Sequence, residues 1–165
     1  MILLKLVSSS SEEIAPGYAR LSLALRLSGS EVFAGIRRAE VARLVTIEDR
    51  RKIRIAKNAL LEFVLFGAKY AFPATWGEIV RGLPTSWAAP PLNQFITDSN
   101  EPPPVWPFGV GKVRGVAIAP LYPTAPLAAF HDPELYAALA CFDAIRAGRA
   151  RERELAAAYF TDRLR

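Results

Sequence analysis

The stretch LSLALRLSGSEV, residues 21–32, has the spacing of one helix, a tight turn and the first turn of a second helix. Leu21 and Leu25 are one helical turn apart and predict the inward face of the first helix. Ser28 and Glu31 match the S-x-x-E pattern of a capping box, in which the serine caps the second helix and the glutamate bonds back to the Ser28 amide. The stretch therefore predicts two helices joined by a short turn.

The second helix is expected to bury Val32, Ile36 and Ala39 and to end near Leu44, where β-branched residues begin. Its N-terminal half then presents an outward face, and in a helix-turn-helix this half enters the major groove of DNA. We expect the following residues to face the bases: Ser30, Phe33, Ala34 and Arg37. Phe33 has two interpretations, contact with a thymine methyl group or packing against another part of the chain.

Two short runs of alternating residues, 45–48 and 52–55, flank a charged turn and predict a β-hairpin after the second helix. Such a hairpin, called a wing, lies near the phosphate backbone or the minor groove of bound DNA. Five cations in and beside it are expected to contact phosphates: Arg50, Arg51, Lys52, Arg54 and Lys57. Five such contacts would give a log–log salt slope of roughly −4 to −5.

Residues 17–57, about one quarter of the chain, resemble the winged helix-turn-helix of bacterial regulators of the MarR type. Three segments carry the resemblance: 21–32, 36–39 and 44–45. Arg26 and Arg43 depart from the family pattern, which often has glycine at these positions. The resemblance implies sequence-specific binding of double-stranded DNA and a role as a transcriptional regulator. The remainder of the chain is similar to uncharacterised bacterial proteins, and that similarity implies no activity.

The positive charge of the chain is concentrated in its first part. Residues 1–72 hold 12 Lys and Arg against 7 Asp and Glu, whereas residues 73–131 and 132–165 each have equal numbers of cations and anions. A local basic surface is what a polyanionic partner requires. The alternative interpretation is a solvent-exposed face that is basic without having a partner.

The middle region, residues 73–131, contains 11 of the 13 prolines and all three tryptophans. Because the prolines interrupt every helical window, we expect irregular chain packed on the rest, with one strand at 111–119 and an exposed loop at 99–104. Four aromatic residues either line a small-molecule pocket or pack in the core, which is the favoured interpretation: Trp76, Trp87, Trp106 and Tyr122.

The last region, residues 132–165, predicts two helices separated at Gly148, with Asp132 as the N-cap of the first. Three residues are expected on the inward face of the first helix: Leu135, Leu139 and Phe142. Leu155, Tyr159 and Leu164 are expected inward on the second. An earlier helix, residues 57–70, is hydrophobic nearly all round and should be covered on both sides, either as a core helix or at a dimer interface.

These patterns predict an α+β protein, mainly α: a winged helix-turn-helix with its following helix at 1–72, and a proline-rich irregular segment with C-terminal helices packed on it at 73–165. The favoured function is DNA binding; the alternative is a protein-binding adaptor or antitoxin-like subunit that uses the winged helix as a scaffold. A homodimer is a further possibility. We expect a cytoplasmic protein without membrane segment, metal, cofactor or enzymatic activity, because apolar runs stay short, no catalytic motif occurs, and single cysteine and histidine residues supply too few ligands.

Overall fold

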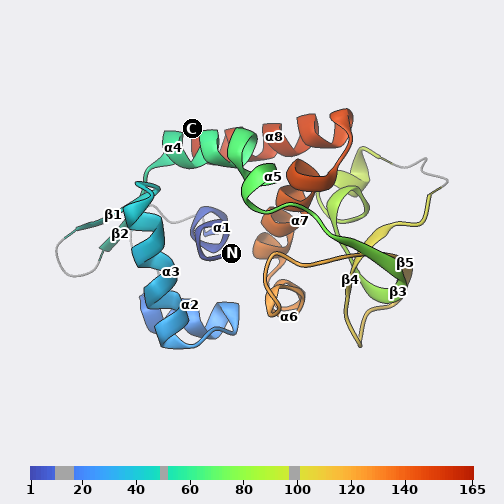
Figure 1. The fold of residues 1–165 in the computed structure, drawn as a ribbon, viewed down its shortest axis with the longest axis horizontal. Helices are drawn as coiled ribbons and strands as arrows, with labels where there is room; N and C mark the ends of the chain where they lie inside the picture. Colours follow the sequence, from blue (N-terminus) through green and yellow to red (C-terminus); the bar gives the residue numbers. More distant parts are fainter. Residues whose placement is uncertain (10–16, 49–51, 97–100) are drawn as a thin grey trace.

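The structure is a computed structural model that describes residues 1–9, 17–48, 52–96 and 101–165 (Figure 1). It is an α+β fold in which helices predominate, as predicted. Its first part contains α1 (Ile2–Ser8), α2 (Tyr18–Leu25), α3 (Gly29–Val41), β1 (Val45–Glu48), β2 (Lys52–Ile55), α4 (Lys57–Glu62), the π-helical η2 (Phe63–Gly67) and α5 (Ala68–Ala71). Its second part contains β3 (Trp76–Pro84), the 3₁₀ turns η3 (Ser86–Ala88) and η4 (Leu92–Gln94), β4 (Pro104–Pro107), β5 (Val113–Ile118), α6 (Ala125–Phe130), α7 (Pro133–Ala147) and α8 (Ala150–Leu164).

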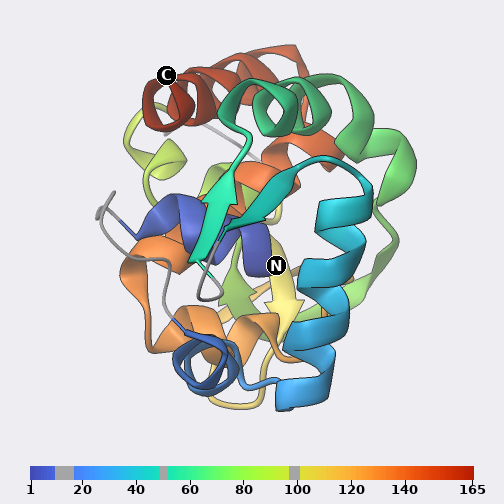
Figure 2. The ribbon, with the colours of Figure 1, turned by 90° about the vertical axis from the view of Figure 1, so that its left-hand side faces the viewer.

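The hairpin β1–β2 and the sheet of β3, β4 and β5 lie at opposite ends of the molecule, with α1 and α7 between them (Figure 1). Helices α4 and α8 run along one side, and the hairpin with α2 and α3 forms the end that faces the viewer in Figure 2. Within the described ranges, no helix combines the length and the apolar character that a membrane span needs.

One apolar core joins the two regions that the sequence analysis separated at residue 72. Leu4 of α1, Leu60 of α4, Leu139 of α7 and Phe160 of α8 all belong to it. The predicted inward residues of α7 are buried, and on α8 Leu164 is buried while Leu155 and Tyr159 are half-buried. Because both regions contribute to the same core, each depends on the other for its apolar cover.

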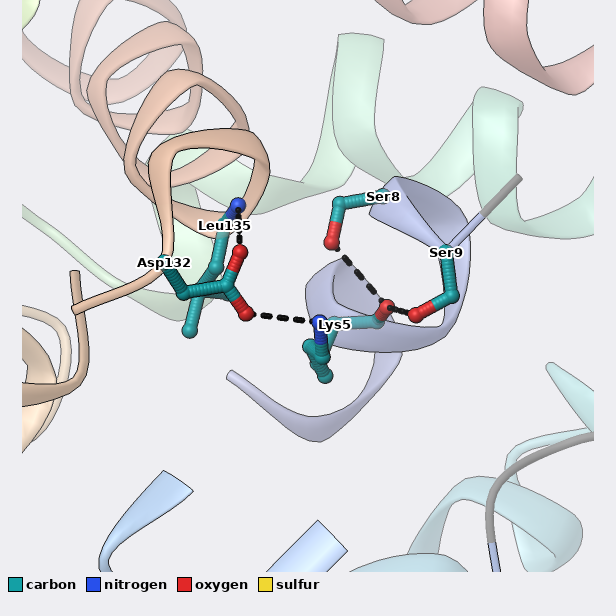
Figure 3. A network of polar contacts seen from close by, with 5 residues as sticks. All are labelled: Lys5, Ser8, Ser9, Asp132 and Leu135. Atoms are coloured by element: carbon teal, nitrogen blue, oxygen red, sulfur yellow. Dashed lines mark hydrogen bonds and ion pairs between the residues drawn. The ribbon is translucent and has the colours of Figure 1, made fainter. Parts of the chain in front are cut away.

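The first helix, which the sequence analysis did not predict, is held to α7 by a charged contact (Figure 3). Lys5 Nζ lies 2.6 Å from Asp132 Oδ2. The other carboxylate oxygen of Asp132 accepts a hydrogen bond of 3.0 Å from the Leu135 amide, so Asp132 is the N-cap of α7, as predicted. At the end of α1, the Ser8 and Ser9 hydroxyls donate to the Lys5 carbonyl at 3.1 and 2.9 Å.

Within the chain, the helix that begins at Lys57 is covered on one side only, so its interpretation as a core helix was wrong and its interpretation as a dimer interface stays a prediction. Leu60, Val64 and Ala68 are buried along one face. On the other face, Phe66 and Tyr70 are 68% and 76% exposed. The central helix is instead α7, which buries nine of its 15 residues.

The proline-rich region forms more regular structure than predicted. The predicted strand at 111–119 is present as β5, but β3 and β4 also form and close a three-stranded sheet with it. Strand β3 pairs antiparallel with both partners, and β4 pairs parallel with β5. Gly82 and Gly115 allow the close approach, since an added Cβ would lie 2.0 and 1.9 Å from a backbone carbonyl oxygen.

Two further predictions in this region need correction. Regular helix was excluded throughout 73–131, yet α6 forms there, because Pro126 lies in its first turn, where no backbone N–H is required. In the exposed loop predicted at 99–104, Glu101 and Pro102 are exposed as predicted, but Pro104 is buried in β4. Residues 99 and 100 lie outside the described ranges.

A buried polar network joins α7 to the sheet region. The Asp143 carboxylate, 1% exposed, accepts hydrogen bonds of 2.7 Å from Thr85 Oγ1 and from Trp106 Nε1. Arg146 Nε lies 2.8 Å from its other oxygen, and both side chains are almost fully buried. A buried carboxylate is tolerated here because a cation and two neutral donors compensate for its lost hydration.

Candidate nucleic-acid interface

Helices α2 and α3 meet at a turn that backbone conformation and side-chain hydrogen bonds both define. Arg26, the first residue after α2, has a φ of 55°, in the left-handed region that favours glycine. The Ser22 hydroxyl donates a hydrogen bond to the Leu27 carbonyl across the turn. The inward residues predicted for the two helices are all buried: Leu21, Leu25, Val32, Ile36 and Ala39.

The predicted capping box is present at the start of α3. The Glu31 amide donates to Ser28 Oγ at 3.2 Å, and the Ser28 amide donates to Glu31 Oε2 at 2.8 Å. The Tyr122 hydroxyl donates to the other carboxylate oxygen of Glu31. The Ser28 hydroxyl also donates to Glu31 Oε2, at 2.6 Å. This hydrogen bond, followed by that from the Tyr122 hydroxyl and that from the Ser28 amide, lowers the pKa of Glu31 to about 2. The hydrogen bond between Tyr122 and Glu31 therefore connects α3 to the proline-rich region. These two residues are too far apart in the sequence for a local pattern to predict their contact.

The outward face of α3 presents three of the four residues that were predicted to face bases. Ser30, Phe33 and Arg37 are exposed. Arg37 Nη1 lies 2.5 Å from Glu40 Oε2 in an exposed ion pair. Ala34 is half-buried and lines a cavity on the side of α3 that faces the rest of the protein.

Phe33 combines features of both interpretations that the sequence allowed. Its ring centroid lies 6.2 Å from that of Tyr18, at an interplanar angle of 38°, so α2 covers part of it. The side chain is nevertheless 55% exposed. Its free part lies beside Ser30 and Arg37 on the same helical face.

The hairpin follows α3 directly and turns its charged side chains outward. Val45 pairs with Ile55 and Glu48 with Lys52 at the two ends of its register. Val45 and Ile53 are buried beneath it. Arg54 is exposed and its Nε lies 2.9 Å from Glu48 Oε1.

Of the five cations predicted for the wing, the structure describes three. Lys52 and Arg54 are exposed on β2, and Lys57 is exposed at the start of α4. Lys57 Nζ is within 3.5 Å of the Arg165 carbonyl, which brings it close to the C-terminal residue. Arg50 and Arg51 lie outside the described residues.

Further exposed cations extend this surface beyond the predicted set. Arg26 ends α2, and Arg43, with a φ of 58°, follows the end of α3. Arg20 is exposed on α2. The sequence could have indicated Arg26 and Arg43, because both occupy positions where the family pattern often has glycine. Glycine at such positions marks a turn with left-handed backbone, and a residue at such a turn usually lies at the surface.

The tryptophan-lined pocket does not form from the four aromatic residues named for it. Trp106 is fully buried and bonded to Asp143, and Trp76 is half exposed on β3. Of the four, Tyr122 alone lines the cavity behind α3, which has a volume of about 730 Å³. Its other walls come mainly from α1, α3 and the helix that begins at Lys57, with Phe142 of α7 and Leu121 completing them.

The described residues contain no group of three or more His, Cys, Asp or Glu side chains with the spacing of a metal site. Cys141 is buried in α7, and burial raises the pKa of its thiol to about 12, so it is unreactive at neutral pH.

Comparison with protein-family models, with curated proteins and with solved structures gives no match. The functional assignment therefore rests on the residues and geometry of the chain itself.

Proposed function

We propose that residues 17–57 form a winged helix-turn-helix that binds double-stranded DNA, and that the protein regulates transcription. The observation that carries the proposal is the juxtaposition of a capped helix, whose outward face exposes Ser30 and Arg37 beside Phe33, with a hairpin bearing exposed cations. Ser30 and Arg37 lie on α3, and Lys52 and Arg54 lie on β2. The net positive charge of residues 1–72 supports a polyanionic ligand.

In this proposal the N-terminal half of α3 enters the major groove. The free N–H groups and dipole of its first turn favour a phosphate beside Ser30. Arg37 would bond the O6 and N7 acceptors of a guanine. Its present ion pair with Glu40 is exposed and therefore inexpensive to exchange for that contact.

The hairpin would lie against the phosphate backbone beside the groove. Lys52 makes no ion pair with a described residue and is free to neutralise a phosphate. Arg54 would exchange Glu48 for a phosphate oxygen, since both ligands suit the planar guanidinium group. Arg26 and Arg43 would add contacts at the ends of the two helices.

The proposal is tested by fluorescence anisotropy with a random duplex and with the duplex upstream of the gene, over about 50–300 mM salt. We expect Arg37→Ala to cost about 1–3 kcal/mol on the preferred duplex and to remove the preference, because it removes a base contact. Lys52→Ala should weaken binding to both duplexes and reduce the salt slope by about 0.9.

The matched control is Arg81→Ala, which removes an exposed arginine from β3 at the opposite end of the molecule (Figure 1). It should leave both affinities unchanged. Loss of affinity in Arg81→Ala equal to that in Arg37→Ala would show a nonspecific effect of charge and overturn the assignment of α3. Absence of binding at low salt would overturn DNA binding itself.

A second candidate function is supported by the exposed aromatic side chains of Phe66 and Tyr70, four residues apart on one helical face. Large apolar side chains grouped on a surface favour a protein interface. In this alternative the protein is an adaptor or antitoxin-like subunit whose winged helix serves as a scaffold. A partner that copurifies with wild type and is lost in Phe66→Ser, with no DNA binding, would favour it.

A further inference from the structure

The cavity behind α3 has the size and lining of a small-molecule site. Its volume of about 730 Å³ is within the range of 300–1,000 Å³ that is typical for organic ligands. Its walls are mostly apolar and include Leu60 of α4, Phe63 of η2 and Phe142 of α7. Leu121, from the segment between β5 and α6, contributes a further apolar wall.

Polar groups gather at one edge of the cavity. Glu31, Arg38 and Tyr122 all line it and all are solvent-exposed. The Tyr122 hydroxyl bonds Glu31 and lies within the electrostatic range of Arg38, so the three form one polar edge of the cavity. The Glu31 carboxylate is already engaged, because Ser28 bonds one oxygen and Tyr122 the other. Its oxygens are therefore occupied as hydrogen-bond acceptors, while the carboxylate keeps its negative charge.

Arg38 differs from its neighbour Arg37 in having no carboxylate partner among the described residues, although its charge acts on the Tyr122 hydroxyl. Arg37 pairs with Glu40, whereas Arg38 makes no ion pair with any residue in the described ranges. Its Nη2 lies 3.8 Å from the point that a Cβ of Gly35 would occupy, so the side chain folds back along α3 toward the cavity. A planar guanidinium at the polar edge of an apolar cavity is suited to a carboxylate or sulfonate.

We infer that this cavity binds a small amphipathic organic anion, with its apolar body between α3 and the wall formed by Leu60, Phe63 and Phe142 and its anionic group on Arg38. Such a ligand satisfies both parts of the lining, since the apolar body fills the interior and the anion meets the Arg38 guanidinium. The inference is independent of DNA binding, and its test contains no DNA.

The test uses two fluorescent probes with one skeleton. 1-Anilinonaphthalene-8-sulfonate carries an anionic group, and N-phenyl-1-naphthylamine lacks it. Both are titrated into the full chain with direct excitation of the dye. We expect Arg38→Gln to raise the Kd of the sulfonate about tenfold, as a charge-assisted hydrogen bond is lost, and to leave the Kd of the neutral probe unchanged. Arg81→Gln, the matched control on β3, should change neither value.

A second variant, Leu121→Trp, places a larger side chain in the apolar lining of the cavity and should weaken binding of both probes. Circular dichroism checks that each variant is folded. Unchanged affinity of both probes in a folded Leu121→Trp would place the dye on an exposed surface, such as that of Phe66 and Tyr70, and overturn the site. Equal effects of Arg38→Gln on both probes, or none on either, would overturn the assignment of an anionic ligand.

Discussion

At the scale of single residues, Glu31 has more roles than its local sequence indicates. It caps α3 through Ser28, lines the polar edge of the cavity and accepts a hydrogen bond from Tyr122. These contacts favour the ionised carboxylate, which is why its pKa falls to about 2. The Glu31 carboxylate thus links the start of α3, the proposed recognition helix, to Tyr122 of the proline-rich region.

Glu31 gives the protein a defined acid sensitivity. Its pKa is lower in the folded than in the unfolded chain, so its contribution to stability is present above the ordinary pKa of about 4.3 and is lost as the pH falls toward 2. We expect wild type to be more stable to urea than Glu31→Gln at neutral pH, with the difference closing between about pH 4.5 and pH 2.

Glu154→Gln serves as the control, because Glu154 is exposed on α8 and has no polar partner among the described residues. It should differ little from wild type at either pH. A stability difference for Glu31→Gln that persists undiminished at pH 2 would show that the charge of Glu31 is not its cause.

At the scale of elements, the three-stranded sheet depends on glycines at its closest contacts. A Cβ at Gly115 would lie 1.9 Å from the Pro103 carbonyl oxygen, and the parallel pairing of β4 with β5 passes through this point. Backbone atoms cannot move aside as a flexible side chain can. The closed sheet therefore tolerates no side chain there.

Gly115→Ala should destabilise the protein by roughly 1–3 kcal/mol, because the strands must separate to admit the methyl group. Gly109→Ala provides a matched control in the loop before β5, where nothing lies within 4 Å of an added Cβ. It should be neutral or slightly stabilising. Urea unfolding measures both, and equal midpoints for the two variants would contradict this account of the sheet.

At the scale of the whole molecule, large exposed apolar side chains lie on two parts of the surface: Leu23, Phe33 and Val41 on α2 and α3, and Phe66 and Tyr70 on the helix that begins at Lys57. The first group lies among the exposed cations of α2, α3 and the hairpin, whereas Phe66 and Tyr70 form a stripe beside which Lys69 Nζ lies 4.8 Å from the Tyr70 ring centroid. The sequence left two interpretations of this helix, a core helix or a dimer interface. Its exposed stripe favours the dimer interface. A two-fold dimer would place two copies of α3 on symmetric DNA half-sites.

The mass in solution is measured by light scattering coupled to gel filtration. We expect the wild-type chain to have the mass of a dimer and the double variant Phe66→Ser, Tyr70→Ser to have the mass of a monomer. The folded monomer should lose little stability, since both side chains are exposed. Val110→Ser removes another exposed apolar side chain, in the loop between β4 and β5, and should remain dimeric. An unchanged mass in the double variant would exclude this stripe as the dimer interface.

The sequence by itself determined the elements whose causes are local. The capping box at Ser28, the helical spacing of Leu21 and Leu25, and the alternation in β1 and β2 are each contained in a few residues. Hydrogen bonds and side-chain periodicity of this kind act within one or two turns of the chain, so α2, α3 and the hairpin formed where their patterns predicted. Asp132 capped α7 for the same reason.

Tertiary structure alone decided the features that join distant segments. Strands β3 and β4 lack alternation and contain prolines, and they become strands because they pair with β5. Asp143 is tolerated in the core only because Trp106, Thr85 and Arg146 meet there. The cavity exists because α1, α3 and Leu121 leave space between them. Such contacts depend on packing between residues far apart in the chain, and no local pattern encodes their geometry.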